Sequence, residues 1–369
     1  MSIFNVTVLN PEPEYKKRVI ELTGTPYEQG VVHGRAAKDL IRCNLEVVRQ
    51  RIGDRLESNV MKLLKENEAF VSQYQPELWQ ELQGLAEGSE LPLEEIALIN
   101  LPLYFVLGWL QQECSQFTKV LTDQNGNTHT VAVKTRDMGE GPYEHVVLLR
   151  QYPNGLEMAE VGLAGIVTFP GSVLTSRGIA VTTSGVWCPR TPFDPAEVNK
   201  GEILPNSHLL AENISTIEDA PKYQEATPRL TGLNYVLASA GKAAGFEVTR
   251  DKATLFEPSD TAVRTNHFLS PEYSYLSPTV AEGPSSYSRF RRITELLATA
   301  ESVHDIWSIA RDHEGYPQNC VCRHKDDTGK GSVTIYASLF IIETNQVFVV
   351  FGNPCECEVS PSIFAIEGR

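Results

Sequence analysis

The sequence lacks the charge balance, the cysteine content and the apolar runs that mark several protein classes. Its 32 basic residues are outnumbered by 47 acidic ones, which gives a formal net charge of −15 at pH 7. Such an acidic chain is poorly suited to nucleic acid or to an anionic membrane surface. Seven cysteines in 369 residues are too few for a disulfide scaffold, and a reducing compartment is the simpler expectation. We therefore expect a cytoplasmic protein whose partners are neither nucleic acids nor membranes.

Membrane and secretion signals are also missing. The longest apolar run, residues 96–110, contains Asn100 and Pro102 and is too short to span a bilayer. Residues 1–13 lack the basic and apolar blocks of a signal peptide. Hydrophobic residues nevertheless make up 41% of the chain, which is enough to build a large core. The length fits one large domain or two, and an oligomer is compatible with these features.

The spacing of apolar residues predicts mainly helices before Cys114. Residues 17–23 indicate a strand, after which Thr25 and Pro26 have the arrangement of an N-cap followed by proline at the first helical position. Gly88 is expected to end one of the later helices. Those helices are predicted over residues 60–74, 77–87 and 96–110.

After Cys114 the apolar residues alternate, which predicts strands. Asn125-Gly126 is a strong hairpin signal. Strands are expected over residues 117–121, 128–133, 146–152, 157–162, 179–183, 234–238, 245–249, 333–342 and 346–351. Helices are expected over residues 204–212, 304–311 and from the serines before Arg289 to Leu297. Antiparallel strands with inserted helices predict an α+β fold in which two sheets lie between helical layers.

Cys114 stands where the pattern changes, and it has two interpretations. Free cysteine is among the most buried residue types, so Cys114 is either an inert core residue or a nucleophile. In the second interpretation the Glu113–Cys114 bond is cut and Cys114 begins a catalytic chain. The cut would give Cys114 a free α-amine, which titrates near about 7.7–8.0 and can serve as a base at neutral pH.

Short motifs in a fixed order support the second interpretation. They are Gly24-Thr25-Pro26-Tyr27-Glu28-Gln29-Gly30 with His33-Gly34, Cys114-Ser115, Lys134-Thr135-Arg136-Asp137, Gly178-Ile179-Ala180-Val181, Thr265-Asn266-His267-Phe268, Ser288-Arg289-Phe290, Asp312-His313-Glu314-Gly315, Cys322-Arg323-His324 and Gly352-Asn353-Pro354-Cys355. In order and spacing, and over nearly the whole chain, they resemble the isopenicillin-N acyltransferase family (acyl-coenzyme A:6-aminopenicillanic acid acyltransferases) of N-terminal-nucleophile (Ntn) hydrolases.

The resemblance implies a fold and a processing event. The fold would be a four-layer αββα sandwich of two mostly antiparallel sheets with a helical N-terminal pro-segment. A cut between Glu113 and Cys114 would leave residues 1–113 bound as a small subunit and residues 114–369 as the catalytic subunit. No metal and no organic cofactor is implied.

The resemblance also implies roles for individual residues. Cys114 would be the nucleophile and, through its α-amine, the base. Asp137 would orient that amine, and Asn266 would donate a hydrogen bond to the oxyanion. Substrate-binding roles fall to Arg289, Lys134 and Ser184. Without the resemblance, Asp137 would be a solvated hairpin carboxylate, Asn266 a turn residue and Arg289 part of a solvated helix face, as Arg291 and Arg292 are expected to be.

Three positions depart from the family pattern. Glu113 stands where the biosynthetic enzymes have glycine, which tolerates a strained backbone better, so we expect slower self-cleavage. Thr135 and Ser184 each stand where the family often has asparagine.

The cysteines and histidines near the C-terminus raise the question of a metal. Cys320/Cys322 and Cys355/Cys357 are Cys-x-Cys pairs, which are shorter than the usual zinc spacing, and we predict no metal there. His33 and His313 are expected to form structural hydrogen bonds within the helical layer.

The predicted activity is acyl transfer from a small N-acyl amide or acyl thioester through a Cys114 thioester, with hydrolysis favoured. One alternative is an acyl-coenzyme A-dependent N-acyltransferase. The other is a non-catalytic binding protein on the same fold, in which Cys114 stays buried and uncut.

Overall fold

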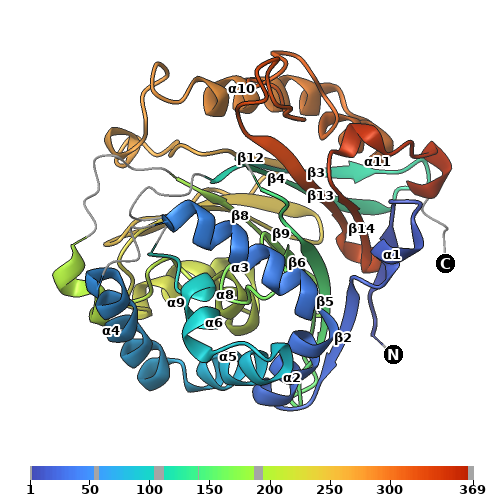
Figure 1. Ribbon diagram of the computed structural model, residues 1–369. Coiled ribbons are helices and arrows are strands. Elements are labelled where there is room, and N and C mark those ends of the chain that lie inside the picture. Colours follow the sequence, from blue (N-terminus) through green and yellow to red (C-terminus); the bar gives the residue numbers. More distant parts are fainter. Residues whose placement is uncertain (1, 54–57, 104–111, 140, 187–193, 365–369) are drawn as a thin grey trace.

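The fold was analysed in a computed structural model that describes residues 2–53, 58–103, 112–139, 141–186 and 194–364. Two sheets form its centre (Figure 1). The first sheet has the strand order β1 (Asn5–Val8), β14 (Gln346–Phe351), β13 (Val333–Ile341), β4 (Thr128–Met138), β3 (Gln112–Thr122) and β12 (Thr261–Arg264). The second has the order β11 (Ala253–Leu255), β10 (Lys242–Val248), β9 (Leu233–Ser239), β8 (Ile179–Gly185), β7 (Ser172–Thr175), β6 (Glu157–Leu163), β5 (His145–Gln151) and β2 (Val19–Thr23).

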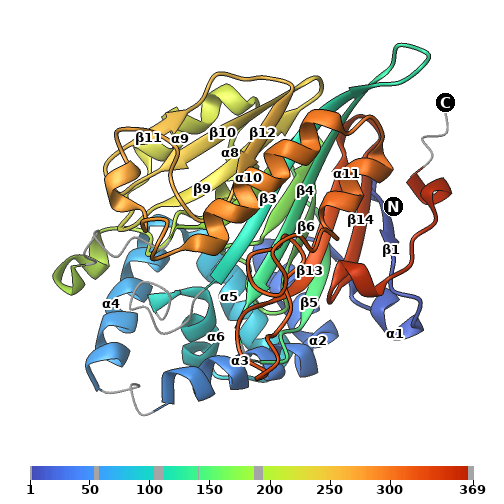
Figure 2. The ribbon, with the colours of Figure 1, turned by 90° about the horizontal axis from the view of Figure 1, so that it is seen from above.

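Helices cover the outer face of each sheet, as Figures 1 and 2 show. The first sheet is covered by α10 (Pro284–Thr299) and α11 (Val303–Ile309), whose apolar residues share a core with β3, β4, β13 and β14. The second sheet is covered by α2 (Pro26–Ala36), α3 (Lys38–Ile52), α4 (Ser58–Tyr74), α5 (Pro76–Ser89), α6 (Leu93–Asn100), α8 (Ser207–Asn213) and α9 (Ala220–Ala226). A further apolar core joins the facing sheets. The expected α+β fold with four αββα layers is confirmed.

The segment before Cys114 contributes to both sheets as well as to the helical layer. β1 pairs in parallel with β14 at one edge of the first sheet. β2 pairs in parallel with β5 at one edge of the second sheet. The other strand pairs are antiparallel. Backbone hydrogen bonds therefore tie this segment to the rest of the molecule at two places, which a purely helical pro-segment would not provide.

Local signals predicted most of the elements correctly. Thr25 caps α2 in a capping box with Glu28, and every strand expected from alternation is present. Four strands were not predicted, namely β1, β7, β11 and β12. The helix expected over residues 96–110 ends at Asn100, and residues 104–110 lie outside the described part of the chain.

The expectation that Gly88 ends a helix is wrong. α5 continues to Ser89 and closes on Glu90, which has a left-handed backbone. Gly84 and Gly88 instead allow α5 to cross α2 closely. A Cβ atom at Gly84 would lie 2.0 Å from the carbonyl oxygen of Tyr27, and one at Gly88 would lie 2.2 Å from that of Val31.

Among the described helices, none combines the length and the apolar character that a membrane crossing needs.

Candidate active site

The pairing of β3 with β4 decides which way Cys114 points. Cys114 is opposite Arg136, and Gln116 is opposite Lys134. Directly opposed residues lie on the same face of a sheet, so these four side chains share one face. Gln116 donates from Nε2 to the Ser184 hydroxyl on β8 of the second sheet, at 2.9 Å. The Cys114 thiol therefore lies between the two sheets, where the residue is fully buried.

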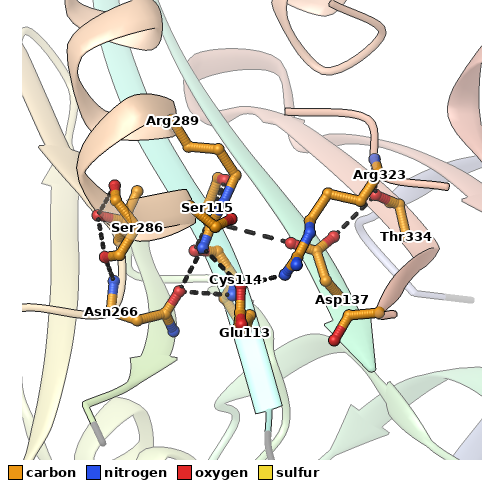
Figure 3. Close-up of polar contacts among 12 residues, drawn as sticks. Glu113, Cys114, Ser115, Asp137, Asn266, Ser286, Arg289, Arg323 and Thr334 are labelled. Carbon is orange, nitrogen blue, oxygen red and sulfur yellow. Dashed lines mark hydrogen bonds and ion pairs between the residues drawn. The ribbon is translucent and has the colours of Figure 1, made fainter. Parts of the chain in front are cut away.

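The backbone nitrogen of Cys114 is held by Asn266, which follows β12. The Cys114 N–H donates to Asn266 Oδ1 at 3.0 Å, as Figure 3 shows. Asn266 Nδ2 donates to the carbonyl oxygen of Gly185 at 2.7 Å, and the Asn266 backbone N–H donates to the Ser286 hydroxyl at 2.8 Å. This nitrogen belongs to the Glu113–Cys114 peptide bond that self-cleavage would break, so Asn266 holds that peptide bond in place.

Arg289 contacts both residues of that bond. Its guanidinium donates to the carbonyl oxygen of Cys114, to Glu113 Oε2 at 3.2 Å and to Asn266 Oδ1 at 2.7 Å. A further bond reaches the Ser115 hydroxyl at 2.8 Å. Burial lowers the pKa of this arginine below its usual value, but an arginine remains charged in proteins. Arg289 is thus not part of a solvated helix face.

Glu113 is also held by Arg323, whose guanidinium donates to the same carboxylate oxygen. The side chain of Glu113 is 28% exposed, whereas those of Arg289 and Arg323 are 0% and 5% exposed. Two buried cations therefore fix the residue before the candidate cleavage bond.

Asp137 lies on the opposite face of the first sheet from the thiol. It is paired with Glu113 across β3 and β4, accepts a hydrogen bond from the Thr334 hydroxyl at 2.7 Å and lies 3.9 Å from Arg289 Nη1. Burial raises the pKa of this carboxyl, although Arg289 and Arg323 oppose the shift. In the uncut chain Asn266, and not Asp137, accepts the N–H of Cys114.

Lys134 and Ser184 also line the space between the sheets. Lys134 Nζ donates to the carbonyl oxygen of Thr183, and its side chain is within hydrogen-bonding reach of Cys114. Burial lowers the pKa of Lys134 to about 8, while the Cys114 thiol acts in the opposite direction. Ser184 donates to the carbonyl oxygen of Thr265, so in the uncut chain its hydroxyl forms internal bonds.

Three neighbours of the site were not assigned roles from the sequence. Ser286 supports Asn266, and Arg323 holds Glu113. Thr334 connects Arg323 with Asp137: its hydroxyl accepts the Arg323 backbone N–H at 2.8 Å and donates to Asp137. Arg323 stands in the Cys322-Arg323-His324 motif, which was a usable signal. No local pattern marks Thr334, whose place depends on the register between β13 and β4.

The two histidines expected to be structural behave differently. His33 is buried in α2 and its Nε2 accepts the backbone N–H of Gly165 at 3.1 Å, and burial lowers its pKa to about 3. The expectation for His313 is wrong, because this residue is exposed and lies outside the helical layer. It belongs to a group of potential metal ligands formed by His313, Cys322, His324 and Cys355.

The chain is similar to characterised acyltransferases. Residues 121–356 match the family described as "AAT: Acyl-coenzyme A:6-aminopenicillanic acid acyl-transferase". The match begins C-terminal to Cys114. An "Acyl-coenzyme A:6-aminopenicillanic-acid-acyltransferase 40 kDa form" from Emericella nidulans is 24% identical over 347 residues, which cover 90% of this chain and 91% of the relative.

Two solved structures are also similar. Penicillin V acylase from Agrobacterium tumefaciens is 16% identical, with a TM-score of 0.36, covering 62% of this chain and 80% of its own. A mutant of the conjugated bile acid hydrolase from Clostridium perfringens is 14% identical, with a TM-score of 0.37, covering 66% of this chain and 95% of its own.

Proposed function

Because the chain belongs to the acyl-coenzyme A:6-aminopenicillanic acid acyl-transferase family, we propose that it is a self-processing enzyme whose nucleophile is Cys114. The chain is an enzyme of acyl transfer that acts on amide bonds. The single observation that carries the assignment of Cys114 is the bond from its N–H to Asn266 Oδ1. Through this bond Asn266 Oδ1 accepts from the nitrogen that the proposed cut would convert from an amide into an amine.

The first step is the cut between Glu113 and Cys114. The Cys114 thiol gives up its proton and its sulfur attacks the carbonyl carbon of Glu113. The C–N bond then breaks, the nitrogen gains a proton, and water releases the resulting thioester. Lys134 is the candidate base for this step because it lies at the thiol and burial lowers its pKa to about 8. A base works best when its pKa is near the working pH.

The cut also opens the site. Cys114 is fully buried in the uncut chain, so a substrate reaches the thiol only after the segment ending at Glu113 has moved. That movement removes one carboxylate from Arg289 and Arg323. Both cations then become available to a carbonyl or carboxylate oxygen of the substrate.

In the acyl-transfer cycle the new α-amine takes the proton of the Cys114 thiol. The sulfur attacks the acyl carbon, and the second N–H of Asn266 Nδ2 donates to the oxyanion. The leaving amine receives the proton, and a Cys114 thioester remains. Water, activated by the α-amine, then releases the acid and restores the thiol. Asn266 Oδ1 and Asp137 are the groups available to orient the amine.

The small number of arginines that the cut would release from Glu113 favours hydrolysis over transfer from acyl-coenzyme A, which is a polyanionic donor. Once the cut has removed Glu113, Arg289 and Arg323 are two cations, which suit one carboxylate or carbonyl oxygen and are too few for a polyanionic donor. Arg291 and Arg292 are paired with carboxylates, at 2.7 Å to Glu295 and 2.7 Å to Asp312 respectively. These two arginines beside Arg289 on α10 are therefore already neutralised.

The test is to trap the acyl-enzyme. The mature protein is mixed with a series of N-acyl amides, quenched in acid and digested, and the peptide beginning at Cys114 is weighed. An added acyl mass on Cys114 is expected, with free acid as the main product. Acylation elsewhere, or no acylation with any amide that is turned over, would contradict the assignment.

A second arm separates hydrolase from transferase. The same amide is offered with and without a competing amine, and an acyl-coenzyme A is offered with that amine. If acyl-coenzyme A is the better donor and free acid is a minor product, the preference for hydrolysis is wrong while Cys114 remains the nucleophile.

A further inference from the structure

Two histidines and two cysteines converge at one point outside the thiol site. The ligand atoms of His313, Cys322, His324 and Cys355 all lie within 4.8 Å of one another. His313 and Cys322 lie in the loop after α11, His324 follows two residues later, and Cys355 lies in the turn after β14. The group thus joins two segments that are distant in sequence.

The distances from His324 Nε2 to the other three ligand atoms are close to those around a four-coordinate ion. The Nε2 atoms of His313 and His324 are 3.2 Å apart. His324 Nε2 is 3.7 Å from the sulfur of Cys322 and 3.4 Å from that of Cys355. Tetrahedral zinc with bonds of about 2.0–2.1 Å to nitrogen and about 2.3 Å to sulfur separates its ligand atoms by about 3.3–3.8 Å.

The spacing of the cysteines did not reveal this group of four ligands, because the two cysteines of each pair have different roles. In each Cys-x-Cys pair only one sulfur reaches the group. Cys320 Sγ instead donates to the carbonyl oxygen of Cys322 at 2.9 Å, and Cys357 packs in the core beneath α10 and α11. An extended chain would place both cysteines of a Cys-x-Cys pair on the same side. Residues 320–322 form bends and Pro354–Glu356 form a 3-10 turn, so one cysteine of each pair faces the group and the other does not.

We propose that His313, Cys322, His324 and Cys355 bind a single zinc ion through two thiolates and two imidazole nitrogens. Binding releases the two thiol protons. Asn353 is suited to support the ligands, because its side-chain amide lies 3.5 Å from Cys322 Sγ and 3.4 Å from His324 Nδ1. In this structure Asn353 Oδ1 faces Cys322 Sγ and Nδ2 faces His324 Nδ1. Rotation of the amide by half a turn on zinc binding would place its oxygen towards Nδ1–H and its nitrogen towards the thiolate, which satisfies both ligands. Four protein ligands leave no open position, which is typical of a structural site.

The zinc ion would also position the processing site, a consequence that rests on the proposed function. Arg323 lies between two of the ligands in sequence, and its guanidinium contacts Glu113. Its backbone N–H bonds to Thr334, which bonds to Asp137. Fixing Cys322 and His324 therefore fixes the residue that holds Glu113 beside the candidate cleavage bond.

The test measures metal content and does not depend on activity. The wild type and the uncut Cys114→Ala chain are expressed without an affinity tag, equilibrated with equimolar zinc and gel-filtered. Both are expected to retain one zinc ion per chain by elemental analysis. Cys322→Ser and Cys355→Ser should retain less than a tenth of that, whereas the matched controls Cys320→Ser and Cys357→Ser should retain it fully.

Two further measurements keep the test decisive if a cysteine variant fails to fold. His313 is exposed, so His313→Ala should fold, and it should lose zinc to a chelator at least ten times faster than the wild type. Cobalt in place of zinc should give the visible absorption of a tetrahedral thiolate complex. No retained zinc in the wild type, equal loss in all four cysteine variants, or a Cys322–Cys355 disulfide in the purified protein would overturn the proposal.

The positioning role has its own readout. His313→Ala should accumulate more uncut chain than the wild type, and added zinc should restore the cut. If zinc binds as described but the uncut fraction does not change, Arg323 is not positioned by the metal. If no variant is ever cut, the proposed function fails and the zinc site stands.

Discussion

Buried charge surrounds the peptide bond between Glu113 and Cys114. Arg289 is fully buried and lies 3.2 Å from Glu113 and 3.9 Å from Asp137. Removing one partner from such a group leaves the others uncompensated, at a cost of about 3–5 kcal/mol. Substitution of Arg289 therefore tests folding as much as chemistry. Asn266 is neutral and is the better residue with which to test the mechanism.

Two substitutions of Asn266 separate its roles in the cleaved enzyme. Asn266→Ala removes both the acceptor for the Cys114 nitrogen and the donor to the oxyanion, and we expect a loss of about 100- to 1,000-fold in kcat. Asn266→Asp keeps an acceptor and removes the donor, so an oxyanion role predicts a similar loss. Steady-state kinetics on correctly cut protein check this. Near wild-type kcat in Asn266→Asp would limit Asn266 to positioning.

The protonation of Lys134 predicts the pH dependence of self-cleavage. Burial lowers its pKa to about 8, so the neutral amine that can accept the thiol proton increases as pH rises and is dominant above pH 8. The rate of cutting should therefore rise with pH and level off above about 8. Loss of a general base typically costs about 100- to 10,000-fold, and Lys134→Met should slow cutting by at least about 100-fold.

Lys119→Met is the matched control, because Lys119 lies on β3, the strand of Cys114, and donates to the carbonyl oxygen of Leu297. It should cut at the wild-type rate with an unchanged profile. A Lys134→Met chain that cuts normally, or a wild-type rate that falls between pH 7 and 9, would remove Lys134 from this step.

At the scale of elements, the segment before Cys114 is built into the fold at several places. β1 and β2 each add an edge strand, and α2 packs on α5 through glycines. A Cβ atom at Gly30 would lie 2.2 Å from the carbonyl oxygen of Glu81. Because these contacts lie away from the cleavage bond, the segment should stay bound after the chain is cut.

The helix crossing gives a stability prediction. Alanine in place of glycine within a helix normally stabilises it by about 1 kcal/mol. Gly84→Ala should instead lower the free energy of unfolding by about 2 kcal/mol, because the new methyl group meets the backbone of Tyr27. Gly139→Ala is the control, since its nearest neighbour is the end of the Arg51 side chain at 3.8 Å. Urea unfolding measures both, and a stabilised Gly84→Ala would contradict the close packing.

The elements that could be predicted from the sequence are those with local causes. The turn at Asn125-Gly126 is held by Asp123, whose Oδ1 accepts the backbone N–H of Asn125 and of Asn127 at 2.8 Å each. β1 has only four residues and forms against β14 near the other end of the chain. No local pattern could indicate it.

The candidate site shows the same difference between features with a local sequence signal and features that depend on distant parts of the chain. Cys114, Asn266 and Arg289 were expected together from motifs, and the structure brings them together. Asp137 was expected to orient the free α-amine after the cut, and this stays a prediction. In the uncut chain the N–H of Cys114 is bonded to Asn266, while Asp137 projects from the other face of the sheet. The grouping of His313 with Cys322 depends on how a loop folds back on itself, which the spacing of the cysteines alone does not specify.

At the scale of the whole molecule, a chain of net negative charge encloses an interior that is cationic near Cys114. The net charge is −15, yet Lys134, Arg136, Arg289 and Arg323 are all buried near Cys114. In a low-dielectric interior such cations favour a developing oxyanion. The buried cations are therefore placed where acyl transfer would develop negative charge.

The intact mass of the purified protein under denaturing conditions is the most direct test of the account. The wild type should give two fragments, one ending at Glu113 and one beginning at Cys114, and gel filtration under native conditions should show them together. Cys114→Ala should give one uncut chain. A wild type that is fully active as a single uncut chain would contradict the central claim that cutting before Cys114 creates the catalyst.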